Sequence, residues 1–185
     1  MAPPGRSRRA DILTAAEREF SAAGFSGGRI ERIALAAGVN KQLLFHYFGS
    51  KEGLFIAALE VLLSTLEPAA AASATPVEDL RTTLKSIELA MQQRPGLTGI
   101  VADARANPDF PGEALSLVRA TLARVQVRLA GILADGQRRG YFRDDIEPAA
   151  VARLAAATAL GSATLEVDGP ATPVDAFVLE HCVWR

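Results

Sequence analysis

The sequence predicts an all-α protein, and the spacing of its apolar residues is the main reason. These residues recur three or four positions apart along most of the chain, as they do on the buried face of an amphipathic helix. Glycine, proline and N-cap residues separate the stripes, and no alternating run predicts a strand. With 185 residues, of which 49% are hydrophobic, the chain is long enough for one domain or two small ones.

The first third of the chain is expected to form four helices in close succession. Gly24 should end the first helix and Gly38 the second, whereas Asn40 should cap the third and Ser50 the fourth. The corresponding apolar stripes cover residues 12–20, 30–37, 43–48 and 54–66.

The rest of the chain is also predicted to be helical. Pro68 and the low-complexity AAAASAT stretch should end the fourth helix and form a flexible connection. Further helices are expected over residues 77–91, 97–105, 112–140, 148–161 and 174–181.

The composition argues against several classes of protein. A single cysteine, Cys182, excludes a disulfide framework within the chain, and two histidines cannot build a histidine-rich zinc site. No segment reaches the ~18 uncharged apolar residues of a membrane helix, and the basic N-terminus lacks the apolar region of a secretory signal. We therefore expect a cytoplasmic protein with no membrane partner, no metal and no cofactor.

Catalytic motifs are not found in the sequence. It contains no phosphate-binding glycine loop, nucleophile elbow, H-E-x-x-H or paired-cysteine motif. His181 and Cys182 are adjacent, and adjacent residues on a helix point apart. Asp144 and Asp145 are better explained as a solvated turn than as an acid–base pair. The chain is predicted not to be an enzyme.

Charge is unevenly distributed along the chain. Residues 1–51 carry eight Lys or Arg and four acidic residues, a net charge of +4, which leaves −5 for the remainder of a chain whose total is −1. A basic N-terminal part on an acidic body suggests a polyanion-binding head, and a solvated basic face is the alternative.

Residues 29–48 form the pattern with the most chemical content. Two short helices are joined by Ala37-Gly38-Val39-Asn40, where Gly38 supplies the positive φ of a tight turn. At the start of the second helix, Lys41 can bind phosphate or guanine and Gln42 can pair with adenine. The spacing fits a helix-turn-helix that enters the major groove, and it fits equally an αα-hairpin that packs its own core.

The stretch RRADILTAAEREFSAAGFSGGRIERIALAAGVNKQLLFHYFGSKEGLF, residues 8–55, closely resembles the DNA-binding domain of TetR-family transcriptional repressors. The resemblance implies a homodimer that binds a palindromic operator and is released by a small-molecule effector. It also implies two domains, a DNA-binding head at 1–50 and a helical ligand-binding and dimerisation region at 51–185. Activators share the same head, and a helical interaction protein that keeps the head without binding specific DNA is the further alternative.

Several head residues match positions that contact DNA in the family. Gln42 and Leu43 resemble base-contacting positions, and Asn40 and Lys41 lie beside them. Where the family usually has Ser or Thr, this chain has Gly27-Gly28-Arg29; we expect Gly28 to cap the second helix with help from Glu31. Arg29 would replace the lost phosphate contact. The remaining candidates for phosphate contact are Arg8 and Arg9 in the first helix, and His46, Tyr47 and Lys51.

The C-terminal two thirds of the sequence gives less detail. The stretch GYFRDDIEPAAVARLAAATALG resembles the family's penultimate helix, which implies a homodimer through the C-terminal helices, and an intramolecular contact is the alternative. An effector pocket would lie between the long helices. Its candidate residues, for which plain core packing is the competing interpretation, are Leu84, Ile87, Met91, Ile100, Leu122 and Val125.

Overall fold

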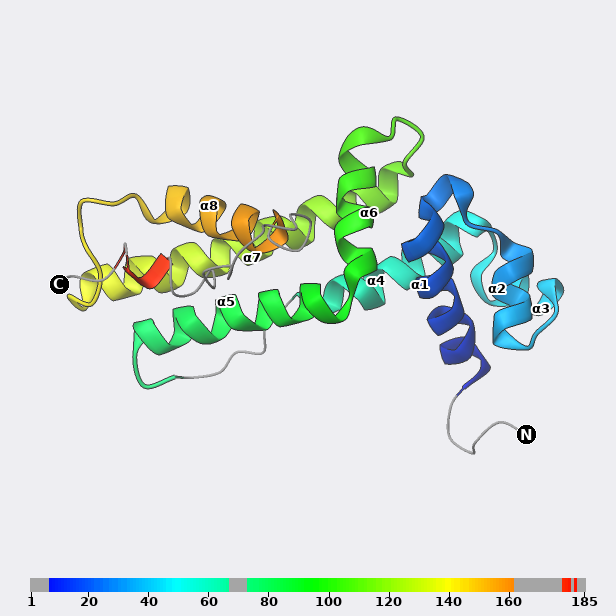
Figure 1. Ribbon diagram of the computed structural model, residues 1–185, viewed down its shortest axis with the longest axis horizontal. Helices are drawn as coiled ribbons and strands as arrows, with labels where there is room; N and C mark the ends of the chain where they lie inside the picture. Colours follow the sequence, from blue (N-terminus) through cyan, green and yellow to red (C-terminus); the bar gives the residue numbers. More distant parts are fainter. Residues whose placement is uncertain (1–6, 67–72, 162–177, 181, 183–185) are drawn as a thin grey trace, which may run out of the picture. The chain divides into compact units, whose positions relative to one another are not determined.

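The computed structural model describes residues 7–66, 73–161, 178–180 and 182, and the regular elements in these ranges are α-helices, as predicted (Figure 1). The chain divides into two compact units, one of Met1–Ser64 with Pro95–Val118 and the other of Thr65–Arg94 with Arg119–Arg185. The labelled helices are α1 (Arg8–Gly27), α2 (Ile30–Ala37), α3 (Lys41–Phe48), α4 (Lys51–Ser64), α5 (Pro76–Gln93), α6 (Pro95–Ala106), α7 (Gly112–Arg138) and α8 (Pro148–Gly161).

Helix α1 is the central element of the first unit. It contacts α2, α4 and α6, and α3 packs on α2 and α4. Its N-terminus is capped by Ser7, whose Oγ accepts a hydrogen bond from the Ala10 N–H at 3.3 Å. The regular helix is interrupted at Gly24, as the sequence predicts, because Gly24 adopts the non-helical angles φ 66° and ψ −176°. A further turn beyond this kink extends α1 to Gly27.

An aromatic cluster of Phe20, Phe25, Phe55 and Phe110 is part of the packing of the first unit. The ring of Phe55 lies 4.9 Å from that of Phe20, 5.1 Å from that of Phe25 and 5.5 Å from that of Phe110, measured between centroids. Phe20 and Phe55 are almost fully buried. The cluster therefore joins both sides of the α1 kink to α4 and to the segment that follows α6.

Helices α1 and α6 approach each other closely at a glycine. A Cβ added to Gly96 would lie 1.9 Å from the Ser21 Oγ and 2.9 Å from the Ser21 Cα. Further along, the Asp103 carboxylate of α6 lies against the kink at Gly24, where an added Cβ would be 3.2 Å from Oδ2. The absence of a side chain at Gly96 thus sets the distance between the two helices.

The second unit contains α5, α8 and the part of α7 from Arg119 onward, and α5 packs against α8. Thr75 caps α5, with its side chain accepting from the Glu78 N–H at 3.2 Å. In the last turn of α7, the Gln137 Nε2 donates to the backbone oxygens of Arg143 and Ile146 at 2.7 and 2.8 Å. These two hydrogen bonds fix the loop that leads into α8.

The helix bounds agree with the sequence pattern to within a few residues. In the first unit, α4 stops at Ser64 instead of residue 66, and α6 begins at Pro95 instead of residue 97. Of the expected last helix, residues 178–180 and 182 are helical, whereas Val174, Phe177 and His181 lie outside the described residues, as does the connection at 67–72. None of the described helices combines the length and apolar character needed to cross a membrane.

Candidate nucleic-acid interface

The turn between α2 and α3 has the geometry that its sequence predicts. Gly38 adopts the left-handed conformation, φ 64° and ψ 35°, and ends α2. The Val39 N–H then donates to the Ala34 oxygen at 3.0 Å, which satisfies a carbonyl at the helix end. Asn40 caps α3, because its Oδ1 accepts from the Leu43 N–H at 2.8 Å. Both ends of the turn are therefore fixed by local hydrogen bonds.

Helix α3 is anchored on one face and free on the other. Leu44 is fully buried, and Leu43 and Phe48 are half-buried. Gln42 and His46 lie opposite Leu44 on the helix, whereas Lys41 and Tyr47 flank the buried side. Of the side chains here predicted to contact DNA, those exposed are Asn40, Lys41, Gln42, His46 and Tyr47.

The N-terminus of α2 differs from the expected one. Arg29 is the N-cap residue, so the assignment of Gly28 as the cap is wrong, and Glu31 does not complete a capping box. The cause is tertiary: the Arg29 N–H donates to the Oε1 of Glu19 in α1 at 3.2 Å. Gly28 is constrained by packing, since an added Cβ would lie 2.5 Å from the Phe20 ring. The exposed side chain of Arg29 takes no part in capping.

Two of the candidate phosphate-binding cations also hold the first unit together. The Lys51 Nζ donates to the Ser26 oxygen at 3.2 Å and lies 5.0 Å from the centre of the Phe25 ring. The Arg9 guanidinium lies 5.3 Å from the centre of the Phe48 ring. Arg8, by contrast, is simply exposed. Arg9 thus lies beside the end of α3, and Lys51, the first residue of α4, lies beside the end of α1.

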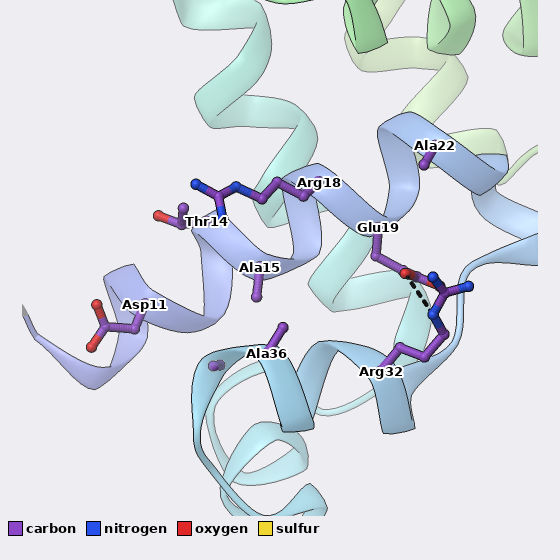
Figure 2. A pocket seen from close by; sticks show the side chains of 9 residues that line it. Asp11, Thr14, Ala15, Arg18, Glu19, Ala22, Arg32 and Ala36 are labelled. Carbon is purple, nitrogen blue, oxygen red and sulfur yellow. Dashed lines mark ion pairs between the residues drawn. The ribbon is translucent and has the colours of Figure 1, made fainter.

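A pocket of about 520 Å³ lies between α1 and α2, and it is not foreseen by the sequence analysis (Figure 2). Figure 2 shows the ion pair of Glu19 and Arg32, with Arg32 Nε 3.3 Å from Glu19 Oε2, at one end of this pocket. Alanines on both helices leave this space unfilled. Their small side chains are the feature of the sequence that could have indicated a pocket here. The lining residues are Asp11, Thr14, Ala15, Arg18, Glu19, Ala22, Arg32, Ala36 and Ala37.

The six candidate effector-binding residues are distributed over three helices. Leu84, Ile87 and Met91 are buried on α5, and on α7 Val125 is buried and Leu122 half-buried. Ile100 is buried on α6, which belongs to the other compact unit. Burial of this kind is what either core packing or a pocket wall requires, so a ligand-binding role for these residues stays a prediction.

The groups considered for catalysis are held in structural roles. Burial raises the pKa of the Cys182 thiol, which keeps it neutral and a weak nucleophile near pH 7. Its backbone oxygen accepts from the Arg143 N–H at 3.0 Å. Arg143 also pairs with Asp145 and lowers the pKa of that exposed carboxyl, as expected of a charged turn and not of a general acid. In the described ranges, no group of three or more His, Cys, Asp or Glu side chains is placed to hold a metal ion.

Comparisons with known proteins agree with this arrangement. Residues 12–58 match the family described as "Bacterial regulatory proteins, tetR family". The chain is 35% identical over 142 residues to the HTH-type transcriptional repressor NicS of Pseudomonas putida, a match covering 75% of this chain and 67% of NicS.

Two solved structures share the fold. A mutant of HlyIIR superimposes with a TM-score of 0.80 at 20% identity, covering 95% of both chains. AibR, solved with isovaleryl coenzyme A and operator DNA, has a TM-score of 0.72 at 20% identity and covers 95% of this chain and 98% of AibR. The matching family model describes regulatory proteins and NicS is named a transcriptional repressor, which confirms the prediction that the chain is not an enzyme. The family match in the head and the long match to NicS together show that the chain belongs to the TetR family of bacterial transcriptional regulators.

Proposed function

We propose that the protein is a homodimeric repressor that binds a palindromic operator through α3 and is released by a small-molecule effector. The observation that carries the proposal is the face of α3: Leu44 anchors the helix, while Lys41 and Gln42 are exposed in its first turn. The N-terminal end of such a helix is the part that contacts base edges in the major groove. The name of NicS as a repressor and the capture of AibR with operator DNA support this function.

We assign different roles to the exposed residues of the head, residues 1–50, and to Lys51 beside it. Gln42 and Leu43 contact bases, Lys41 contacts a base or phosphate, and Asn40 holds the helix start in position. Contacts to phosphate fix the orientation of the head without specifying sequence. The residues proposed for these contacts are Arg8, Arg9, Arg29, His46, Tyr47 and Lys51.

The region 51–185 is proposed to bind the effector and to form the dimer. AibR contains isovaleryl coenzyme A, which supports an effector in this fold without indicating which compound this chain binds. The dimer would pair the C-terminal helices of two copies. Ala155 and Ala156 are buried within one copy, so the side of α8 left for a second copy is the one that carries the exposed Leu154.

The direct test is fluorescence-anisotropy binding of the purified protein to the intergenic DNA that flanks its own gene. Scrambled DNA at the same salt concentration is the comparison, because phosphate contacts alone bind any sequence. A preference of about 10³ or more is expected for specific recognition. Candidate effectors are then screened by the release of bound DNA, and dimer mass is measured by sedimentation.

The alternatives give different results in the same experiment. If neither intergenic nor scrambled DNA is preferred, selection from random oligonucleotides shows whether another operator exists. A failure of that selection would favour an interaction protein that keeps the head without specific DNA binding. Transcription in vitro from a template that carries the operator separates a repressor from an activator, since only the repressor lowers transcript yield.

Replacing Gln42 by alanine is expected to weaken operator binding by about 1–3 kcal/mol. The amide can donate to and accept from one adenine, and alanine removes both hydrogen bonds at a single base pair. Binding to operators altered at each position in turn should show that sequence preference is relaxed at one base pair. An equal weakening on operator and scrambled DNA would show that Gln42 does not contact a base.

Replacing Arg29 by alanine is expected to remove one contact with phosphate, in contrast to the loss of a base contact in Gln42→Ala. The capping hydrogen bond of Arg29 comes from the backbone N–H, so the substitution leaves the link to Glu19 in place. We expect operator and scrambled DNA to be weakened alike, and the slope of log K against log salt to become shallower by about 0.9. If the salt slope of the variant equals that of the wild type, Arg29 does not contact phosphate.

A further inference from the structure

A carboxylate contacts one of the residues proposed to bind DNA. Glu31 is in the first turn of α2 and forms an ion pair with Lys41, whose Nζ donates to Glu31 Oε1 across the turn between the helices. The side chains of Glu31 and Lys41 are 62% and 51% exposed, so both remain accessible to DNA. Lys41 is therefore engaged before any DNA is present.

Glu31 is fully ionised near neutral pH. The hydrogen bond from Lys41 lowers the pKa of the Glu31 carboxyl, with a smaller contribution from the charge of Arg29. In contact with DNA, this negative charge disfavours nearby phosphates, and it competes with them for the Lys41 ammonium. A lysine ammonium has three donors, so the ion pair still leaves donors for a base edge.

We propose that Glu31 is a specificity-determining residue, which keeps Lys41 at the start of α3 and withholds it from the DNA backbone. This inference rests on the proposed function. In a non-specific complex, binding depends on phosphate contacts, and Lys41 can add one only by leaving Glu31. In the operator complex, Lys41 keeps its ion pair and uses its remaining donors on a base, beside Gln42. Glu31 thus penalises random DNA more than the operator.

Glu31→Gln in the full-length protein tests the inference, with an operator selected from random oligonucleotides and a random-sequence duplex as probes. Freed Lys41 should add about one phosphate contact on random DNA, which steepens the salt slope by about 0.9. The ratio of random-DNA affinities at 50 and 200 mM salt should then grow about threefold. Operator affinity should not rise in proportion, so the operator-to-random ratio falls.

Two further variants separate an action through Lys41 from a general effect of charge. Glu60→Gln removes the same charge from an exposed position on α4 of the same unit, and it should change neither the slope nor the ratio. In a Lys41→Gln background, Glu31→Gln should no longer steepen the salt slope on random DNA, and only the smaller gain from relieving the direct repulsion between Glu31 and phosphate should remain. An undiminished effect in that background, or an equal effect of Glu60→Gln, would overturn the role assigned to Glu31.

The experiment also distinguishes this inference from the proposed function. If the wild type prefers its operator, and Glu31→Gln has the same operator-to-random ratio and the same salt slope as the wild type, the inference is overturned and the proposed function stands. A wild type without any operator preference overturns both. Circular dichroism at the assay temperature confirms that each variant is folded, which the exposure of Glu31, Lys41 and Glu60 favours.

Discussion

Replacing Phe55 by alanine is expected to lower the free energy of unfolding by about 3–5 kcal/mol. Phe55 is 1% exposed and its ring contacts Phe20, Phe25 and Phe110, so the substitution opens a cavity where three segments meet. The lost contacts include edge-on and tilted ring pairs, which contribute beyond the buried area. Urea unfolding followed by circular dichroism measures the change.

Phe45→Ala is the matched control for this prediction. Phe45 is in the same unit but 43% exposed, so its removal leaves no enclosed cavity. We expect its effect on the unfolding free energy to be under about 1 kcal/mol, as for most surface substitutions. A Phe55→Ala loss no larger than that of Phe45→Ala would show that the aromatic cluster is not what stabilises the first unit.

Gly96→Ala is expected to destabilise the protein by about 1–3 kcal/mol, through overpacking between α1 and α6. The new methyl group would lie 1.9 Å from the Ser21 Oγ, 2.0 Å from its Cβ and 2.9 Å from its Cα. A rotamer change at Ser21 cannot relieve contacts with its Cβ and backbone, so the helices must move apart. This cost outweighs the helix propensity that alanine gains over glycine, about 1 kcal/mol at most.

Gly99→Ala, three residues further along α6, should have the opposite effect. Gly99 is exposed, and the nearest atom to an added Cβ there is the Ser21 oxygen at 4.0 Å, an ordinary contact distance. Propensity then acts alone and should stabilise the helix by up to about 1 kcal/mol. Thermal melting of the two variants side by side checks the pair, and equal melting temperatures would contradict the close contact at Gly96.

The features that follow from neighbouring residues are predictable from the sequence. The turn at Gly38 and the Asn40 cap depend on backbone geometry within a few residues, and both are found where they are expected. The cap of α2 depends instead on Glu19, ten residues away, and on the Phe20 ring against Gly28. Such contacts exist only after the helices have packed, so sequence spacing could not reveal them.

In the candidate interface too, local features follow from the sequence, whereas contacts between helices do not. The apolar stripe over 43–48 agrees with the burial of Leu44, and Lys41 and Gln42, which precede the stripe, are exposed. Periodicity could not show the ion pair of Lys41 with Glu31, because that contact depends on the angle between two helices. The pattern cannot decide whether the six proposed effector residues line a pocket or fill the core, because an apolar stripe has the same spacing in both cases.

The shallow attachment of α3 has a consequence for the energetics of DNA binding. This helix buries one side chain, Leu44, whereas α4 buries six, and its remaining support comes from the turn and the Asn40 cap. Segments with few buried contacts open locally at low free energy, so we expect the amide hydrogens of α3 to exchange faster than those of α4. Part of the operator binding energy is then spent on ordering α3, and affinity becomes adjustable by substitutions that stiffen this helix without contacting DNA.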